Sequence, residues 1–180
     1  MKYVYRNTKE DYVEFNMVVS SNTKPGKRNM FINRMIMSIL FYIFVMAGII
    51  LHVTEIHFFK ISDLIYYVLF ALLAIFWFFY YPYLVKRSMS KNLDKMSKQG
   101  KMPYNKELSI ELLDDKIIEN SEMSQVVLPY TEVYKIIKTE NLIIVMNSVV
   151  SGFIVPIRCL NGDEKKVLEF LKEKGCKIIQ

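Results

Sequence analysis

Two histidines and one glutamate in the segment HVTEIHFFK are the side chains whose types are suited to a metal site. His52, Glu55 and His57 supply two imidazoles and a carboxylate, a set that binds zinc in some proteins. On a helix His52 and Glu55 would share a face, but His57 does not follow Glu55 at a spacing of three or four residues. We interpret the three as polar residues at the end of an apolar segment and expect no metal.

No other motif in the sequence indicates a reaction. Glycine-rich phosphate loops and a GxSxG motif are missing, and two histidines beside an apolar segment leave no cytoplasmic Ser-His or Cys-His centre. The acidic pairs at 114–115 and 163–164 are typical of a turn and a helix start. Cys159 and Cys176 lack metal-binding spacing and are interpreted as reduced structural thiols. We therefore expect no catalytic residue, no cofactor and no enzyme activity.

Two long apolar segments dominate the first half of the chain. Residues 35–54 and 64–85 contain no Asp, Glu, Lys or Arg. Each run is long enough, at about 1.5 Å per residue, to cross a hydrocarbon core of roughly 30 Å. We predict transmembrane helices at 35–56 and 64–85, joined by a short extracytoplasmic loop at 57–63.

The charges that flank these segments predict their orientation. Basic residues cluster before the first span and after the second, whereas the connecting loop contains Lys60 as its one basic residue. The positive-inside rule then places both termini in the cytoplasm of a multi-pass protein of the cell membrane, which we take to be a bacterial inner membrane. The residues expected to contact its anionic inner leaflet are Lys24, Lys27, Arg28, Arg34, Lys86, Arg87, Lys91 and Lys95.

An aromatic stretch passes directly into a basic one after the second span. We predict an amphipathic linker helix at 86–103, in which Val85, Met89, Leu93 and Met96 form an apolar stripe against the membrane surface. Nucleic-acid binding is the other use of such a basic tract, but a membrane anchor already accounts for the charge. We expect no nucleic-acid partner.

The remaining segments predict a cytoplasmic domain of strands and helices. Residues 1–23 are predicted to form a strand and a helix capped by Thr8 and Asp11, packing on a domain at 104–180. That domain has hairpins at 114–115 and 140–141 and a C-terminal helix with an Asn161–Glu164 capping box. Pro156 makes the 152–158 run an edge strand. We predict that a partner docks there, on Phe153, Val155 and Arg158.

The order of these segments resembles the YcxB-like family of small bacterial membrane proteins. The resemblance rests on TKEDYVEFN at 8–16, the basic KPGKR after it, and LPYTEVYKIIKTENLIIVM at 128–146 leading into FIVPIRCL. Tyr134 stands where that family often has tryptophan. The resemblance implies a pleckstrin-homology-like (PH-like) domain, a bent antiparallel sheet closed by a C-terminal helix, and it implies no activity. The expected fold class is therefore membrane α+β, a transmembrane hairpin plus this PH-like sheet.

Three functions remain open from the sequence. The favoured hypothesis is a membrane-anchored interaction or scaffold module that binds a protein partner or itself. The small size and the compact hairpin also allow an immunity protein that protects its own cell from a toxin or antimicrobial peptide. An accessory subunit of a transporter, or a small oligomeric pore, is the third hypothesis, although neither span has an ionisable residue deep within it.

Overall fold

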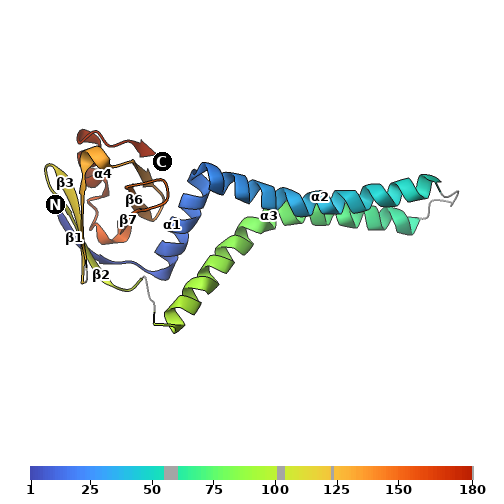
Figure 1. Cartoon of the computed structure of the whole chain (residues 1–180), viewed down its shortest axis with the longest axis horizontal. Coiled ribbons are helices and arrows are strands. Elements are labelled where there is room, and N and C mark those ends of the chain that lie inside the picture. Colours follow the sequence, from blue (N-terminus) through green and yellow to red (C-terminus); the bar gives the residue numbers. More distant parts are fainter. Residues whose placement is uncertain (55–60, 101–103, 123, 180) are drawn as a thin grey trace. The chain divides into compact units, whose positions relative to one another are not determined.

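The computed structural model describes residues 1–54, 61–100, 104–122 and 124–179 and has an α+β fold (Figure 1). Its elements, in chain order, are β1 (Lys2–Arg6), α1 (Lys9–Asn22), α2 (Lys24–Thr54), α3 (Ile61–Lys98), β2 (Glu107–Leu112), β3 (Lys116–Ser121), β4 (Gln125–Pro129), a 3-10 turn (Tyr130–Glu132), β5 (Lys135–Lys138), β6 (Leu142–Met146), β7 (Gly152–Pro156), a second 3-10 turn (Ile157–Cys159), α4 (Glu164–Glu173) and β8 (Ile178–Ile179).

The chain forms two compact units, and one of them is discontinuous in sequence. The first unit combines Met1–Val19 with Met89–Gln180, and the second consists of Ser20–Ser88. The apolar helices are therefore an insertion between the first strand of the β unit and the rest of it. This arrangement agrees with the expectation that the N-terminal strand and helix belong with the C-terminal domain.

Two four-stranded sheets make up the β unit. The first has the order β1-β2-β3-β4 and is antiparallel throughout, with Arg6 opposite Glu107 and Ile110 opposite Glu119. The second has the order β7-β6-β5-β8. The hairpins predicted at 114–115 and 140–141 are both present, and β7 lies at a sheet edge, as Pro156 required. The short β8 pairs in parallel with β5, which the sequence did not indicate.

The second sheet is covered on both faces. One face, with Ile143 and Val145, joins the main core together with the first sheet and α4. The opposite face, with Ile144 and Ile154, packs against Tyr12 and other apolar residues of α1. Because both faces are covered, all five residues of β6 are buried, so its sequence reads as a continuous apolar run instead of alternating.

The N-terminal caps of α1 and α4 were both predicted from the sequence, and one of the two predictions is correct. The Thr8 hydroxyl accepts the amide of Asp11, and the Asp11 carboxylate accepts the amide of Thr8, which is the predicted reciprocal cap. The prediction of a capping box formed by Asn161 and Glu164 is wrong. Asn161 instead occupies a left-handed turn (φ 52°), and Asp163 precedes α4 without a side-chain cap bond.

The C-terminal end of α4 is a Schellman motif. Gly175 has φ +79°, its amide donates to the carbonyl of Lys172, and the amide of Cys176 donates to the carbonyl of Leu171 at 3.1 Å. Cys176 is buried in the main core, which fits its interpretation as a structural thiol.

Unit 2 contains two helices that pack antiparallel. The Ser38 hydroxyl donates to the carbonyl of Ala74 at 3.1 Å, and the ring of Phe70 contacts Phe41 and Phe44. Gly48 allows another close approach, because a Cβ atom there would lie 2.7 Å from the ring of Tyr67. Small residues thus lie where the helices meet, as the sequence suggested.

The helices are longer than the segments predicted from apolar runs. Helix α2 begins at Lys24, because the Thr23 hydroxyl accepts the amide of Gly26 and caps it, so the expected basic turn is mostly the first turns of a helix. The predicted span at 64–85 and the predicted linker as far as Lys98 form one continuous helix, α3, which passes through Pro82, and residues 101–103 of that linker lie outside the described residues. Residues 57–60 of the predicted loop, with Glu55 and His57, lie outside the described residues.

Candidate functional site

A pocket of about 290 Å³ opens in the β unit where α1, the first sheet and the β6–β7 turn approach one another. We refer to it as the Glu119 pocket. Its apolar walls include Tyr12 and Phe15 of α1 and Ile154 of β7, and its polar residues come from the first sheet and its flanking segments. Its full lining is Asn7, Tyr12, Phe15, Lys106, Leu108, Glu119, Ser121, Ser124, Val150, Ser151, Gly152 and Ile154.

The carboxylate of Glu119 is the negatively charged group that lines this pocket. Glu119 lies two residues after Ile117 on β3, so the two side chains are on the same face of the sheet. Ile117 is fully buried, so this face is the inner one. The hydroxyl of Tyr5 donates to its Oε1 at 2.9 Å. Burial raises the pKa of Glu119 above its usual range, and the bond from Tyr5 opposes this shift. Burial and the charge of Glu119 also raise the pKa values of Tyr5 and Tyr12.

Asn7 contributes a second acceptor to the same pocket. It is 2% exposed, and its Oδ1 is buried with no hydrogen-bond partner among the described residues. A buried amide oxygen without a donor costs about 1–3 kcal/mol relative to a bonded one. The residues that line the Glu119 pocket therefore include two with acceptor groups, the carboxylate of Glu119 and the amide oxygen of Asn7, and the amide oxygen is buried without a donor among the described residues.

A buried ion pair fixes the segment that carries Asn7. The two guanidinium nitrogens of Arg158 donate to the two carboxylate oxygens of Asp11, at 2.8 and 2.6 Å. Arg158 also donates to the carbonyl of Arg6, and the amide of Asn105 donates to the carbonyl of Asn7. The connection from β1 to α1 is thus held from both sides, which restrains Asn7 in the pocket.

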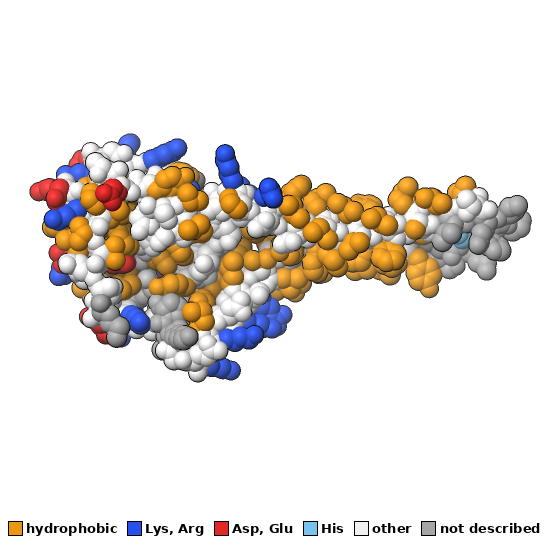
Figure 2. All heavy atoms as spheres, in the orientation of Figure 1, with side chains coloured by type: hydrophobic (Ala, Val, Ile, Leu, Met, Phe, Trp, Pro, Cys, Tyr) orange, Lys and Arg blue, Asp and Glu red, His pale blue; other side chains and the backbone are white. Residues whose placement is uncertain are grey.

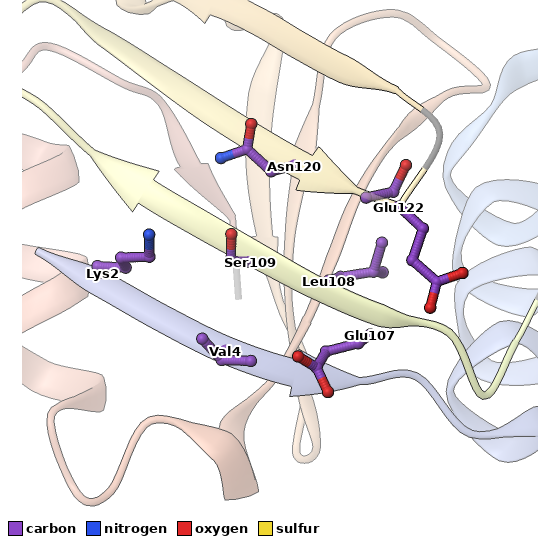
Figure 3. Close-up of a pocket in the computed structure, with 8 residues that line it drawn as sticks. Lys2, Val4, Glu107, Leu108, Ser109, Asn120 and Glu122 are labelled. Atoms are coloured by element: carbon purple, nitrogen blue, oxygen red, sulfur yellow. The ribbon is translucent and has the colours of Figure 1, made fainter.

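A second hollow, of about 410 Å³, lies on the outer face of the first sheet. Figure 3 shows Val4, Ser109 and Asn120 side by side across β1, β2 and β3, in agreement with the strand register. Two of the charged side chains that line it are paired at the surface, Lys2 with Glu111 and Glu107 with Arg6. It is a shallow polar surface without a buried polar group that lacks a partner, so it is the weaker candidate for a ligand site.

The docking residues predicted on the edge strand need correction. Phe153 is 5% exposed and Val155 is 3% exposed, and both lie in the main core. Their side chains point between the sheets because β7 alternates like its neighbours, so a partner does not reach them from outside. Arg158 is occupied by Asp11, as described above. Strand β7 still lies at the edge of its sheet, so a docking partner would have to bind its backbone N–H and C=O groups.

The residues predicted to contact lipid fall into two groups. Lys24, Lys27, Arg28, Lys86, Arg87, Lys91 and Lys95 are exposed. Arg34 is half-buried, with its guanidinium carbon 5.5 Å from the centre of the Phe78 ring. The expected apolar stripe is in part a protein contact, because Leu93 is buried against Val13 and Tyr104. The stripe is therefore not wholly available to a membrane surface.

Sequence reasoning missed the Glu119 pocket. Asn7 and Glu119 are distant in the chain, and neither belongs to a recognisable motif. One signal was present: in KIIENS the inward positions of the strand are Ile117, Glu119 and Ser121, so a glutamate lies where an apolar residue is expected. For metals, no group of three or more His, Cys, Asp or Glu residues able to hold an ion exists in the described part of the chain.

The surface of unit 2 is mostly hydrophobic. Figure 2 shows apolar side chains covering the α2 and α3 region, and most of the large ones along both helices are exposed. Two helices, α2 and α3, are long and apolar enough to cross a membrane by length and composition. An exposed apolar surface of this extent marks a contact with lipid or with another protein.

Comparison with known proteins supports the resemblance seen in the sequence. The model of a family described as YcxB-like protein matches residues 112–171, from the end of β2 to α4. The expected resemblance to YcxB-like proteins is thereby confirmed for this segment, which includes Glu119 but not Asn7. No curated protein and no solved structure matches the chain.

Proposed function

We propose that the protein is a membrane-anchored binding module. Helices α2 and α3 cross the cell membrane as a hairpin, and the β unit binds a partner at the cytoplasmic surface. The module acts by holding its partner at the membrane and catalyses no reaction. In this proposal its partners are the anionic inner leaflet and a protein, which is either a different chain or a second copy.

The discontinuous β unit is the observation that carries the proposal. Strand β1 pairs with β2 along its whole length, although the apolar helices separate them in the chain. If both helices span a bilayer, the pairing requires both flanks of the hairpin to lie on one side of it. A single span would leave the two flanks on opposite sides of the bilayer, and β1 could not then pair with β2.

The distribution of charge supports a cytoplasmic location for the two flanks of the hairpin and for the β unit. Exposed basic residues lie at the flanks of the hairpin, among them Lys24, Lys27 and Arg28 before the first span and Lys86 and Arg87 after the second. Residues 107–180 carry more acidic than basic groups, so this part of the β unit is poorly suited to anionic head groups. Lipid contact is assigned to the basic flanks and partner binding to the β unit.

The proposed PH-like character of the β unit rests on its architecture. Two sheets, antiparallel except for the short strand β8, pack around one core. Helix α4, which follows β7 in the chain, contributes Val167 and Leu171 to that core. Folds of this kind serve as scaffolds for ligand sites and peptide docking, with activity determined by the site and not by the fold.

A topology and crosslinking experiment tests this function. Full-length protein is expressed in bacteria with a protease-cleavable tag at each end, and intact and broken cells are treated with protease. We expect both tags to be protected in intact cells and cleaved together in broken ones, and the protein to remain in membranes washed with alkaline carbonate. Release by carbonate, or cleavage of either tag in intact cells, would contradict the proposal.

The binding role needs a second measurement in the same cells. A photo-crosslinking amino acid is placed at Lys106, at the mouth of the Glu119 pocket, and separately at Lys165, exposed on α4. The proposal expects a discrete adduct from the first position that the second does not give. Identical adducts from both positions, or none from either, would argue against a binding module.

A further inference from the structure

We propose that the Glu119 pocket binds an ammonium or guanidinium group carried on an apolar stem. The inference rests on the proposed function, because it names the chemistry that the binding module recognises. The ligand inserts its cationic end between Glu119 and Asn7, and its stem lies against the walls formed by α1 and β7.

The polar groups in the pocket select a donor. Glu119 accepts one hydrogen bond, from Tyr5 to Oε1, and its second oxygen has no donor among the described residues. Asn7 Oδ1, also at the pocket, has none either. An ammonium has three donors and no acceptor, and a guanidinium has five, so either satisfies both oxygens at once. A carboxylate or phosphate would bring further acceptors to a site that already has two without donors.

The charge of Glu119 is not explained by the fold alone. Tyr5 would donate equally well to the oxygen of a glutamine, and a neutral side chain would avoid the desolvation of a carboxylate at an inward position of the sheet. The negative charge is therefore a cost to the free protein. A bound cation offsets that cost, because opposite charges in a partly desolvated site favour each other's ionised forms.

The walls and size of the pocket fit a side chain rather than a large ligand. A volume of about 290 Å³ lies at the small end of the range for ligand sites, roughly 300–1,000 Å³. Tyr12, Phe15, Val150 and Ile154 supply the apolar and aromatic wall. Such a wall suits the methylene stem of a lysine, an arginine or a short alkylamine, which buries its carbon atoms and directs its charge to the acceptors.

Lys106 is the cationic side chain at this pocket. It is exposed, whereas Glu119 is half-buried, so solvent screens the charge of Lys106 more strongly. For a cationic ligand Lys106 is a weak repulsive contribution, and for an anionic ligand it would be the principal attraction. The effect of removing it therefore has opposite signs for the two ligand types.

The test measures probe binding by full-length protein in lipid nanodiscs, using saturation-transfer NMR. The probes are Nα-acetyl-lysine amide, Nα-acetyl-arginine amide, and the neutral analogue Nα-acetyl-norleucine amide. We expect the first two to bind and the third to bind at least about tenfold more weakly, because it has lost the charged donor. Equal binding of all three would overturn the proposal, since the stem alone would then explain it.

Matched variants locate the binding. Glu119→Gln keeps the bond from Tyr5 and the shape of the side chain, and should weaken binding of the lysine probe by about tenfold; Asn7→Ala should weaken it by a smaller factor. Glu169→Gln removes an exposed carboxylate on α4 and should change nothing. An unchanged affinity in Glu119→Gln would overturn the proposal, provided that its thermal unfolding shows the β unit intact.

The variant Lys106→Gln shows whether the pocket binds a cation or an anion. We expect it to leave the affinity for the lysine probe unchanged or slightly higher, and loss of binding in this variant would identify an anion site instead.

Two sources of the cation are separated by comparing cadaverine with a lysine-containing tripeptide: tighter binding of the tripeptide indicates a protein side chain, and tighter binding of cadaverine a free amine. Because insertion and crosslinking are measured separately, this inference can fail while the membrane-anchored module stands.

Discussion

Arg158 and Asp11 are 147 residues apart in the chain, and they form a two-pronged ion pair with nitrogen–oxygen distances of 2.8 and 2.6 Å. Asp11 is 3% exposed and also caps the start of α1 through Thr8. The pair thus joins the segment before the apolar helices to the end of the second sheet.

Removing Arg158 should destabilise the β unit. Arg158→Ala leaves the buried Asp11 with only its bonds to Thr8, so we expect a loss of about 2 kcal/mol in the free energy of unfolding. Lys166→Ala breaks an exposed pair with Asp163 and should lower the free energy of unfolding far less, because solvent screens an exposed pair. A thiol-reactive dye can follow the unfolding in detergent, because both cysteines of the chain belong to the β unit. Equal losses in the two variants would contradict this role.

The same ion pair predicts a dependence on pH. Burial raises the pKa of Asp11, but the bonds from Arg158 and Thr8 outweigh it and hold the pKa below its usual value. A carboxyl with a lowered folded-state pKa stabilises the fold above its unfolded pKa of about 3.9, and this contribution is lost as the pH falls through the folded value. The stability difference between wild type and Arg158→Ala should be constant from pH 7 to 5 and shrink below pH 4. A difference that persists at low pH would show that Arg158 acts by packing alone.

Glu119 should show the opposite trend. Its folded-state pKa is raised by burial, so the folded protein retains a proton that the unfolded chain has lost, and stability falls as the pH rises from the unfolded pKa of about 4.3 through the folded value. Glu119→Gln should therefore be more stable than wild type at pH 7 and equal to it below pH 4, in the dye assay. A less stable variant at pH 7 would mean that the charge supports the fold.

Gly48 should control the packing of the two apolar helices. Gly48→Val places carbon atoms where the ring of Tyr67 lies, so the helices must separate locally. Crosslinking between cysteines introduced at Phe41 and Phe70, in a variant without the native cysteines, measures this, because those rings lie 6.1 Å apart. We expect a yield several-fold lower with Gly48→Val and unchanged with Ala47→Val, whose side chain is exposed. Equal yields would show that the close approach at Gly48 is not needed.

The elements that the sequence predicted well are those with local signals. The apolar helices follow from uninterrupted hydrophobic runs, the hairpin at Asp114–Asp115 from its turn residues, and the end of α4 from Gly175. The errors also have local causes. Thr23 and Pro25 form the start of helix α2, upstream of the predicted span, and Asn161 adopts a left-handed turn in place of the predicted cap.

The candidate site depended on contacts that no local pattern contains. Phe153 and Val155 were expected outside because Pro156 indicated an edge strand, but an edge strand can still have both faces covered, here by the first sheet and by α1. Asn7 and Glu119 line the same pocket because β1 pairs with β2, although the apolar helices separate these two strands in the chain. A polar residue at one inward strand position was the available hint, and a single sequence cannot show what faces it.

The separation of β1 from β2 also imposes an order of events during synthesis. About one hundred residues separate Arg6 from its partner Glu107, and at roughly 5–20 residues per second the ribosome needs several seconds to make them. For that time β1 and α1 have no sheet to join, while both apolar segments emerge and, in the proposed topology, enter a membrane. The β unit can close only when both flanks of the hairpin lie on the same side. A chain in which only one of the two segments crossed the bilayer would leave β1 and β2 on opposite sides, with β1 unpaired and open to proteases, so completion of the sheet requires both segments to cross.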